Sequence, residues 1–476
     1  MNYDFSAPPV DFEKYTVPSV KERLHADPSL TGKGITIAFL DSGFYPHPDL
    51  YGRIAAYHDT AGEVKELKPE FCRNAWNWHG MQTSVVAAGN GALSDGRYCS
   101  LAPDAKVVLV KVSRKGHICD DLIVEGIKWV RANAKRLNIR ILNISVGSDR
   151  DPSALDCEIS KEAEALAGED VLVIAAAGND GGLPRPPANA PSVLTVGGSV
   201  SREACSSEEI KLYSSNFGVI LDLVVKPEVI APAAWVAAPL LPGTEIFRRA
   251  EYYYDVARSS GGHLLNLMNE APKAANTPDN YLTMKPEELT EFVDSVLKKD
   301  KIVGRYYQHV DGTSFAAPIT ASLAAQLMEA NPSLTPAAIR QILMSTADRV
   351  QGQNLLAQGC GVVNAGRAAE QAKVAWTDEQ ICELRPPLVE NGRLSFVFVN
   401  YTAKKIELLG DFNNWTRGSS FEEVLPGLWK IEIEAPKIGM YRYKFLADGS
   451  DWFEDPANLY RKPNVFGTYD SVLSIT

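Results

Sequence analysis

The sequence predicts an α/β domain built around a parallel β-sheet, followed by a small all-β domain. Two observations predict the first domain. Strand-like apolar runs alternate with helical segments, and several of these runs are apolar on both faces, as in strands buried inside a parallel sheet. The third observation concerns the second domain, because after residue 384 short alternating strands separated by turn residues replace the helices. With 476 residues, the chain is longer than one usual hydrophobic core, which agrees with two domains.

The elements of the first domain follow from the apolar pattern. Strands are expected at residues 35–40, 106–112, 140–145, 171–176 and 192–196. Helices are expected at about 120–138, 153–168, 316–330 and 337–346. Thr313 is expected to cap the helix that contains Ala316, and Pro318 falls early in that helix, where a missing N–H group costs least.

Four polar residues stand at the ends of these elements. Asp41 ends the buried run ITIAFLD, and Asn179 follows the buried run VLVIAAAG. His79 opens a small-residue helix, and Ser314 lies where a loop turns into a helix. Open α/β sheets keep their sites at the carboxyl ends of the strands, and a helix N-terminus favours developing negative charge. Each residue taken singly also fits a structural role, and only the four together point to a functional site.

The order Asp, His, Asn, Ser resembles that of the subtilisin-like serine proteases. The matching stretches are DSG at 41–43, HG at 79–80, AAGN at 176–179 and GTSFAAP at 312–318. This resemblance covers about residues 30–370 and implies a three-layer domain with a parallel sheet between helices. The assigned peptidase domain is 31–375, preceded by an extension over 1–30 that either covers the active site or packs on the surface.

The resemblance implies an endopeptidase that hydrolyses peptide bonds in protein or peptide substrates. It makes Ser314 the nucleophile, His79 the general base, Asp41 the carboxylate that orients His79, and Asn179 the oxyanion donor. The substrate-binding residues that it implies are Ser145, Val146, Gly147, Ala176, Ala177 and Gly178. The run Met81–Ser84 departs from the family pattern and is interpreted as a variation in helix packing. The alternative is a catalytically silent binding or scaffold protein on the same fold.

Composition narrows the partners and the compartment. The chain is 45% hydrophobic and 22% charged with a net charge of −11, which is typical of a folded soluble protein and argues against nucleic acid as a partner. No apolar stretch is long enough to span a membrane. Seven cysteines without a C-x-x-C pair suggest neither disulfides nor a zinc site, so we expect a cytoplasmic protein with no required cofactor.

One loop has features that would also fit a calcium site. Residues 91–99 resemble the loop that carries calcium in relatives, and Asn90 and Asp95 offer oxygen ligands. A single carboxylate also fits a loop without any metal. No metal ligand is assigned, and calcium remains an alternative.

An insertion interrupts the first domain. The run VKPEVIAP at 225–232 resembles a family segment that closely precedes the serine loop, but here about 80 residues intervene. Residues 243–308 are therefore expected to form a partly helical subdomain near the cleft. A purely structural excursion is the alternative.

The second domain, residues 385–476, is expected to be an immunoglobulin-like β-sandwich. Its runs GDFNNW, GMYRYKF and DGSDW resemble the glycogen- and starch-binding modules of branching enzymes and of the AMP-activated kinase β subunit. That resemblance implies an α-glucan partner, with Trp415 and Trp452 stacking on sugar rings and Lys444 donating to a hydroxyl. Asp470 stands where these modules often have Asn. A domain used for packing or protein contacts is the alternative.

Overall fold

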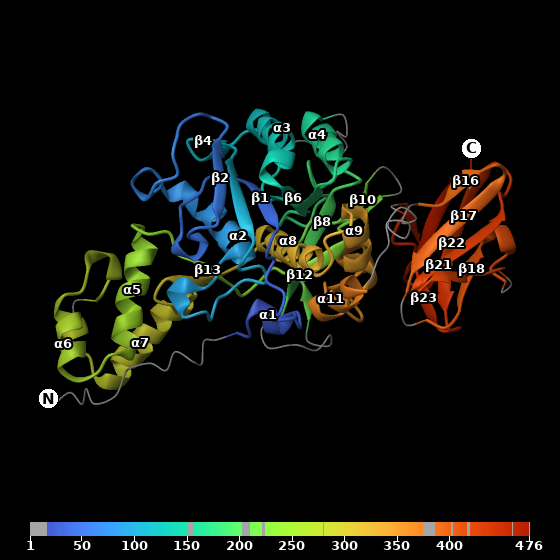
Figure 1. The fold of residues 1–476 in the computed structure, drawn as a ribbon. Coiled ribbons are helices and arrows are strands. Elements are labelled where there is room, and N and C mark those ends of the chain that lie inside the picture. Colours follow the sequence, from blue (N-terminus) through green and yellow to red (C-terminus); the bar gives the residue numbers. More distant parts are fainter. Residues whose placement is uncertain are drawn as a thin grey trace.

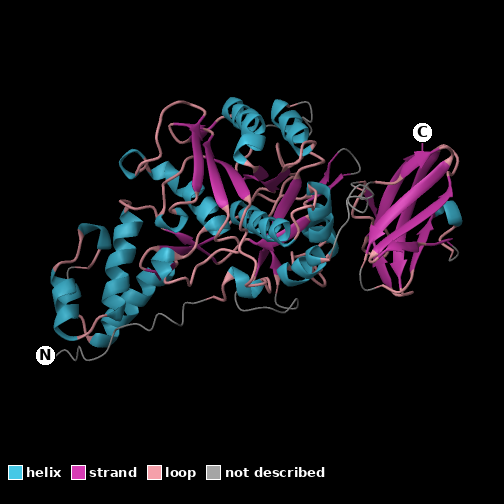
Figure 2. Ribbon diagram, viewed as in Figure 1, coloured by secondary structure: helices cyan, strands magenta, loops and turns pink. Residues whose placement is uncertain are grey.

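The computed structural model describes residues 17–149, 157–201, 210–220, 224–278, 280–374, 386–400, 403–416, 419–458 and 460–475. Figure 1 shows helices around a central sheet in the N-terminal part of the chain and strands in the C-terminal part, and Figure 2 shows the same division by element type. Within these residues, no helix is both long enough and apolar enough to cross a membrane.

The central sheet is parallel along its main path. Its strands, in spatial order, are β12 (Val229–Pro232), β8 (Leu194–Val200), β7 (Leu172–Ala176), β6 (Ile139–Ile144), β1 (Thr36–Asp41), β3 (Lys106–Lys111) and β2 (Ile54–Asp59). A short strand, β9 (Lys211–Leu212), pairs antiparallel with β8. The structure thus confirms the predicted α/β domain with a parallel sheet.

Both faces of the sheet are buried under helices, which explains why its strands are apolar throughout. On one face, Ile37 and Phe39 of β1 join the core formed with α2 (Trp78–Ala88), α8 (Thr313–Ala330), α9 (Pro336–Ser345) and α11 (Ala365–Lys373). On the other face, Ala38 and Leu40 join the core formed with α3 (Asp120–Leu137) and α4 (Glu158–Ala167). The alternation along β1 therefore produces three layers.

The start of α8 differs from the expectation. Gly312, with φ 141°, occupies the N-cap position, and Thr313 is already the first helical residue. The expectation that Thr313 caps the helix is wrong, because its hydroxyl bonds to Gly178 and Asn179 instead. Pro318 lies inside the helix.

Short elements complete this part of the chain. They are α1 (Val20–Arg23), β4 (Ser113–Arg114), β5 (His117–Ile118), β10 (Gly218–Ile220), β11 (Val224–Lys226) and α10 (Leu355–Gln358). Single 3₁₀ turns are η2 (Pro48–Leu50), η3 (Pro69–Phe71), η4 (Ala75–Asn77), η5 (Ala92–Ser94), η6 (Lys273–Ala275), η7 (Tyr281–Thr283) and η8 (Asp411–Asn413).

The insertion has its own core. Its elements are α5 (Glu245–Arg258), α6 (Gly261–Asn269), α7 (Pro286–Lys299), β14 (Ile302–Gly304) and β15 (Tyr307–Val310). Tyr253, Val256, Leu289 and Val293 are buried together between its helices. β15 pairs with β14 and with β13 (Val236–Pro239), and this small sheet joins the helices to the domain that contains the parallel sheet. Figure 1 shows the three helices projecting away from the parallel sheet.

The C-terminal region consists of two antiparallel sheets. One contains β16 (Leu388–Glu390), β17 (Arg393–Val399), β21 (Leu428–Glu434) and β20 (Glu422–Leu425). The other contains β19 (Ser419–Ser420), β18 (Ile406–Gly410), β22 (Gly439–Ala447), β25 (Tyr469–Ile475), β24 (Arg461–Pro463) and β23 (Asp451–Phe453). Side chains such as Phe396, Leu408 and Phe445 fill the space between the sheets. Antiparallel sheets are as predicted, while an immunoglobulin-like identity stays a prediction.

The two regions touch through a polar and an apolar contact. Arg349, beyond α9, forms an ion pair with the buried Glu454 of the C-terminal sheets. Val397, Val399 and Leu428 belong to the same buried apolar cluster as the alanines of α11. The C-terminal sheets therefore dock on the α/β domain.

Candidate active site

Asp41 and His79 meet where β1 ends and α2 begins. Asp41 is the last residue of β1 and fully buried, and its Oδ1 lies 2.7 Å from Nδ1 of His79. A Cβ added to Gly80 would lie 2.2 Å from the carbonyl oxygen of Gly43. The missing side chain of Gly80 thus lets the first turn of α2 pack directly on the loop after β1, which brings His79 to Asp41.

Separate donors hold the two carboxylate oxygens of Asp41. The backbone N–H of Ser42 donates to Oδ1 at 2.7 Å, the same oxygen that faces His79. Thr83 Oγ1 donates to Oδ2 at 2.9 Å. The sequence analysis missed Thr83, although its position four residues after His79 places both side chains on one face of a helix.

The charge of Asp41 sets the proton affinity of His79. Burial alone lowers the pKa of His79, because it disfavours the imidazolium. The negative charge of Asp41 and its hydrogen bond outweigh burial, so the pKa of His79 lies above its usual value. The pair can therefore accept a proton at His79 and stabilise the resulting cation.

Ser314 is the second residue of α8, beside the end of β6. Its Oγ donates to the carbonyl oxygen of Ser145 at 3.3 Å, and Ser145 Oγ donates to the carbonyl oxygen of Ser314 at 3.0 Å. The ring of His79 lies 6.0 Å, between centroids, from the ring of Phe315, the residue after Ser314. The described residues contain no hydrogen bond between Ser314 and His79, so Ser314 Oγ faces Ser145 in this state.

Asn179 is exposed near the start of the loop that follows β7 and is held by its amide oxygen. Oδ1 accepts hydrogen bonds from Thr313 N–H at 2.9 Å and from Thr313 Oγ1 at 3.0 Å. Both bonds use the oxygen, so the Nδ2 group remains to donate. Ser314 N–H lies in the first turn of α8, where backbone N–H groups have no partner within the helix. These two donors lie close to the loop that carries Ser314.

The six predicted substrate-binding residues lie at the ends of neighbouring strands. Ser145–Gly147 directly follow β6, and Ala176–Gly178 lie at the end of β7, which pairs parallel with β6. Ser145 is buried and Gly147 is exposed. Gly178 adopts φ 106°, a backbone conformation that favours glycine. Two backbone segments thus run side by side next to Ser314, but which of their atoms contact a substrate stays a prediction.

The loop at 91–99 is held by protein donors. The side-chain oxygen of Asn90 accepts from Ala92 N–H at 3.1 Å. The carboxylate of the buried Asp49 beneath it accepts from Leu93 N–H at 3.2 Å and from the Tyr307 hydroxyl at 2.6 Å. In the described part of the chain, no group of three or more His, Cys, Asp or Glu residues is placed to hold a metal. Whether this loop binds calcium stays a prediction.

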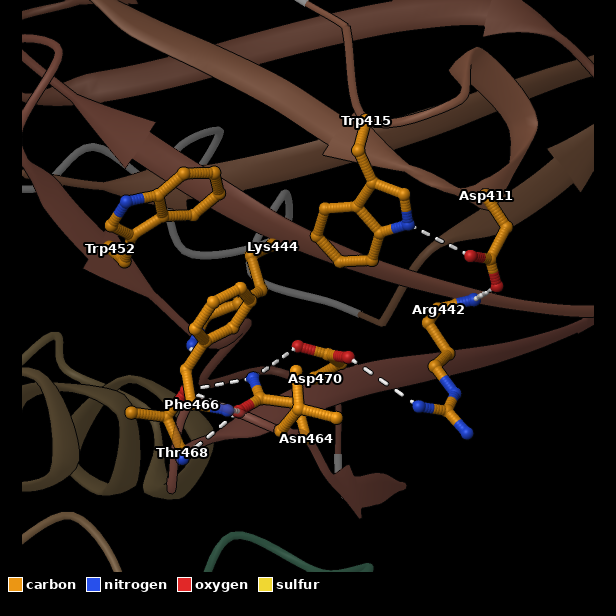
Figure 3. Close-up of a pocket in the computed structure, with 10 residues that line it drawn as sticks. Asp411, Trp415, Arg442, Lys444, Trp452, Asn464, Phe466, Thr468 and Asp470 are labelled. Carbon is orange, nitrogen blue, oxygen red and sulfur yellow. Dashed lines mark hydrogen bonds and ion pairs between the residues drawn. The ribbon is translucent and has the colours of Figure 1, made fainter.

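A second candidate site lies on the C-terminal sheets (Figure 3). It is a cavity of about 610 Å³, and Trp415 and Trp452 both line it. Trp415 is fixed by a hydrogen bond from Nε1 to Asp411 at 2.9 Å, while Trp452 is 46% exposed. Further lining residues, which the sequence analysis did not single out, are Asp411, Arg442, Asn464, Val465, Phe466 and Thr468.

Lys444 and Asp470 contact other residues of the pocket. Lys444 is 4% exposed and donates to Glu454 at 3.2 Å and to Thr468 at 3.0 Å. Asp470 accepts from Asn464 Nδ2 at 2.7 Å. Because the ammonium of Lys444 is already engaged, its main contact is with the base of the pocket rather than with open space. Asn464 supplies an amide beside Asp470, where the sequence analysis noted that an Asn was missing.

Comparison with known proteins covers most of the peptidase part. Residues 32–362 match the Subtilase family. Serine protease AprX of Bacillus subtilis is 29% identical over 357 residues, which are 72% of this chain and 68% of that protein. Subtilisin Savinase of Lederbergia lenta is 26% identical over 344 residues, which are 71% of this chain and 92% of that protein.

A solved structure gives the same fold. Fervidolysin from Fervidobacterium pennivorans, a keratinolytic enzyme related to subtilisin, superposes with a TM-score of 0.50 at 18% identity. The superposition covers 89% of this chain and 54% of fervidolysin. The parallel sheet, the ordered motifs and these relatives together define a subtilisin-like serine protease. The chain belongs to the Subtilase family and carries additional antiparallel sheets in its C-terminal region.

Proposed function

We propose that this chain is an endopeptidase in which Ser314 attacks the substrate carbonyl. The observation that supports this most strongly is the 2.7 Å contact between Asp41 Oδ1 and His79 Nδ1, next to a serine at a helix N-terminus. With Nδ1–H held by Asp41, the free nitrogen of His79 is Nε2, the atom that must take the proton from Ser314. A rotation of the Ser314 side chain away from the Ser145 carbonyl lets Oγ give its proton to His79 Nε2 and attack the substrate.

The proposed reaction has two halves. Ser314 Oγ bonds to the carbonyl carbon while its proton passes to His79, and the developing oxyanion accepts from Asn179 Nδ2 and Ser314 N–H. His79 then gives the proton to the leaving amine, and the peptide bond breaks to leave an acyl-enzyme. Water then gives a proton to His79 while its oxygen attacks the ester carbonyl, and His79 returns that proton to Ser314 Oγ as the ester bond breaks.

Hydrolysis of an unfolded protein tests this proposal. Purified wild type is expected to cleave reduced casein, and Ser314→Ala is expected to lose this cleavage while keeping its melting temperature. Ser322→Ala, which alters a buried serine further along the same helix, is the matched control and should cleave normally. Ser314→Ala with full cleavage contradicts the proposal, and wild type that neither cleaves casein nor is labelled by a fluorophosphonate favours a silent scaffold protein.

Narrow specificity and an intracellular location are also part of the proposal. The insertion and the docked C-terminal sheets favour a peptidase with restricted substrate access over a peptidase that degrades proteins in general. The odd number of cysteines supports a reducing compartment. Cleavage profiling on a peptide library is expected to give a few preferred sequences, and uniform cleavage would contradict restricted specificity.

A second candidate function, α-glucan binding, is supported by the C-terminal pocket. Two indole rings and Phe466 line a cavity that also contains the amide of Asn464, a combination that suits sugar faces and hydroxyl groups. Affinity electrophoresis in glycogen gels should retard the full chain, and Trp415→Ala with Trp452→Ala should abolish retardation. Equal mobility of wild type with and without glycogen would identify the region as a packing or interaction module.

A further inference from the structure

The base of the insertion is fixed to the peptidase domain by buried contacts. The hydroxyl of Tyr307 in β15 donates to Asp49 at 2.6 Å, and both side chains are almost fully buried. The hydroxyl of Tyr98 donates to the carbonyl oxygen of Val303 in β14 at 2.7 Å. Buried hydrogen bonds of this kind are costly to leave unmade. The sheet β13–β15–β14 therefore forms a rigid base on which the three helices of the insertion stand.

Lys301 lies next to this base, and its side chain contacts the loop that carries Ser314. It lies between α7 and β14 with φ 51°, a left-handed backbone that non-glycine residues rarely adopt without a reason. Its carbonyl oxygen accepts from His309 N–H at 2.8 Å, which ties it to β15. Its ammonium forms an ion pair with Asp311 and lies 4.9 Å from the ring centre of Trp235. The insertion thus contacts the nucleophile loop three residues before Ser314.

The three residues before Ser314, namely Asp311, Gly312 and Thr313, are each held by a contact from outside α8. Asp311 also accepts from Trp235 N–H at 3.1 Å, and the N–H of Gly312 donates to the carbonyl oxygen of Ala233 at 2.7 Å. Thr313 is held by Asn179, as described above. Of these contacts, the ion pair at Asp311 is the one that comes from the insertion.

We propose that Lys301 is a positioning residue for Ser314, and that the insertion sets the position of the nucleophile loop through the Lys301–Asp311 ion pair. This inference rests on the proposed nucleophilic role of Ser314. The Lys301 and Asp311 side chains are 34% and 31% exposed, so the ion pair adds little to overall stability. A displacement of a nucleophile by about 1 Å, in contrast, can lower the rate by up to about 100-fold. Loss of the ion pair is therefore expected to lower the catalytic rate more than it lowers the stability of the fold.

The test compares Lys301→Met, which removes the charge, with Lys301→Arg, which keeps it. The measurements are kcat and KM on a peptide substrate, the rate at which a fluorophosphonate labels the protein, and the melting temperature. Lys301→Met is expected to lower kcat and the labelling rate by about 10-fold, within the range for a misplaced nucleophile, with KM unchanged within about 2-fold. Lys301→Arg is expected to restore most of both rates. Lys298→Met, which breaks the Lys298–Asp294 pair in the same insertion, is the control and should behave as wild type.

A double-mutant cycle with Asp311→Asn makes the test specific to the pair. The asparagine still accepts from Trp235 N–H but has no charge for Lys301, so the two substitutions should be far from additive in kcat. A lower melting temperature with unchanged kcat and labelling, additive effects, or failure of Lys301→Arg to rescue would overturn this inference alone. If wild type itself is neither labelled nor active, the proposed function fails and the inference fails with it.

Discussion

Thr83 Oγ1 donates a hydrogen bond of 2.9 Å to Oδ2 of Asp41, the carboxylate oxygen that does not face His79. Both Thr83 and Asp41 are fully buried. Because His79 and the Ser42 backbone occupy Oδ1, Thr83 fixes the remaining oxygen and with it the plane of the carboxylate. The orientation of the imidazole thus depends on a threonine one helical turn beyond the histidine.

Thr83→Val is expected to lower kcat by roughly 3- to 10-fold, the equivalent of one typical hydrogen bond of about 1 kcal/mol. Valine keeps the shape of threonine, so KM should change little, while the melting temperature should fall because a buried oxygen of Asp41 loses its donor. Ser84→Ala is the matched control, because the Ser84 hydroxyl bonds to the carbonyl oxygens of Gly80 and Met81 in its own helix. Steady-state kinetics decide, and equal kcat values for the two variants would contradict the role given to Thr83.

The pH dependence follows from the raised pKa of His79. A general base must be neutral, so kcat/KM is expected to fall as the pH drops through a pKa above the usual histidine value of about 6.5. Asp41→Asn removes the charge that raises this pKa. In that variant the inflection should therefore move to lower pH, while kcat falls by up to about 10,000-fold. An inflection at unchanged pH in Asp41→Asn would show that another group controls the profile.

Asn179→Ala is expected to lower kcat by about 100- to 1,000-fold with little change in KM, because an oxyanion donor acts mainly in the transition state. Thr313→Val removes one of the two donors that hold the Asn179 oxygen, so a smaller loss of kcat is expected. Kinetics on one peptide substrate compare the two variants. A rise in KM without a fall in kcat would show that Asn179 is not the oxyanion donor.

The docking of the C-terminal sheets is expected to depend on pH through Glu454. Burial raises the pKa of Glu454, but Arg349 and Lys444 outweigh burial and hold it below its usual value. A lowered pKa stabilises the docked state above the usual glutamate pKa of about 4.3, and this contribution is lost as the pH falls through the lower docked-state pKa.

Arg349→Met removes one of these cations, so the loss should begin at higher pH. The radius of gyration from small-angle scattering between pH 3 and pH 7 measures the docking. Lys405→Met alters an exposed lysine that pairs with Glu407 on the same sheets and serves as the control. Identical curves for wild type and Arg349→Met would contradict a role for this ion pair.

Much of the fold could be predicted, because buried parallel strands are apolar on both faces and leave a clear pattern. The expected strand at 171–176 compares with β7 at Leu172–Ala176, and the expected helix at 120–138 compares with α3 at Asp120–Leu137. Thr313 was placed wrongly because the local cap pattern cannot reveal a competing partner. Its hydroxyl bonds to Gly178 and Asn179, about 135 residues away in sequence, so tertiary contacts replaced the cap.

In the candidate site, too, motifs predicted some contacts, while other contacts depend on tertiary packing. Asp41 and His79 could be paired from motifs, but the contact of Lys301 with Asp311 depends on how the insertion packs, which the motifs do not show. The resemblance to glycogen-binding modules implied that Lys444 donates to a sugar hydroxyl, and that role stays a prediction. Its contact with Glu454, which itself pairs with Arg349 of the peptidase domain, depends on how the two regions dock.

The identity of the nucleophile is the central claim, and covalent labelling tests it most directly. Wild-type protein is incubated with a fluorophosphonate, digested and mapped by mass spectrometry, with Ser314→Ala and Ser322→Ala in parallel. We expect one phosphonate per chain on Ser314 in wild type and in Ser322→Ala, and none in Ser314→Ala. Absence of labelling in folded wild type, or a label on another residue that persists in Ser314→Ala, would contradict the account.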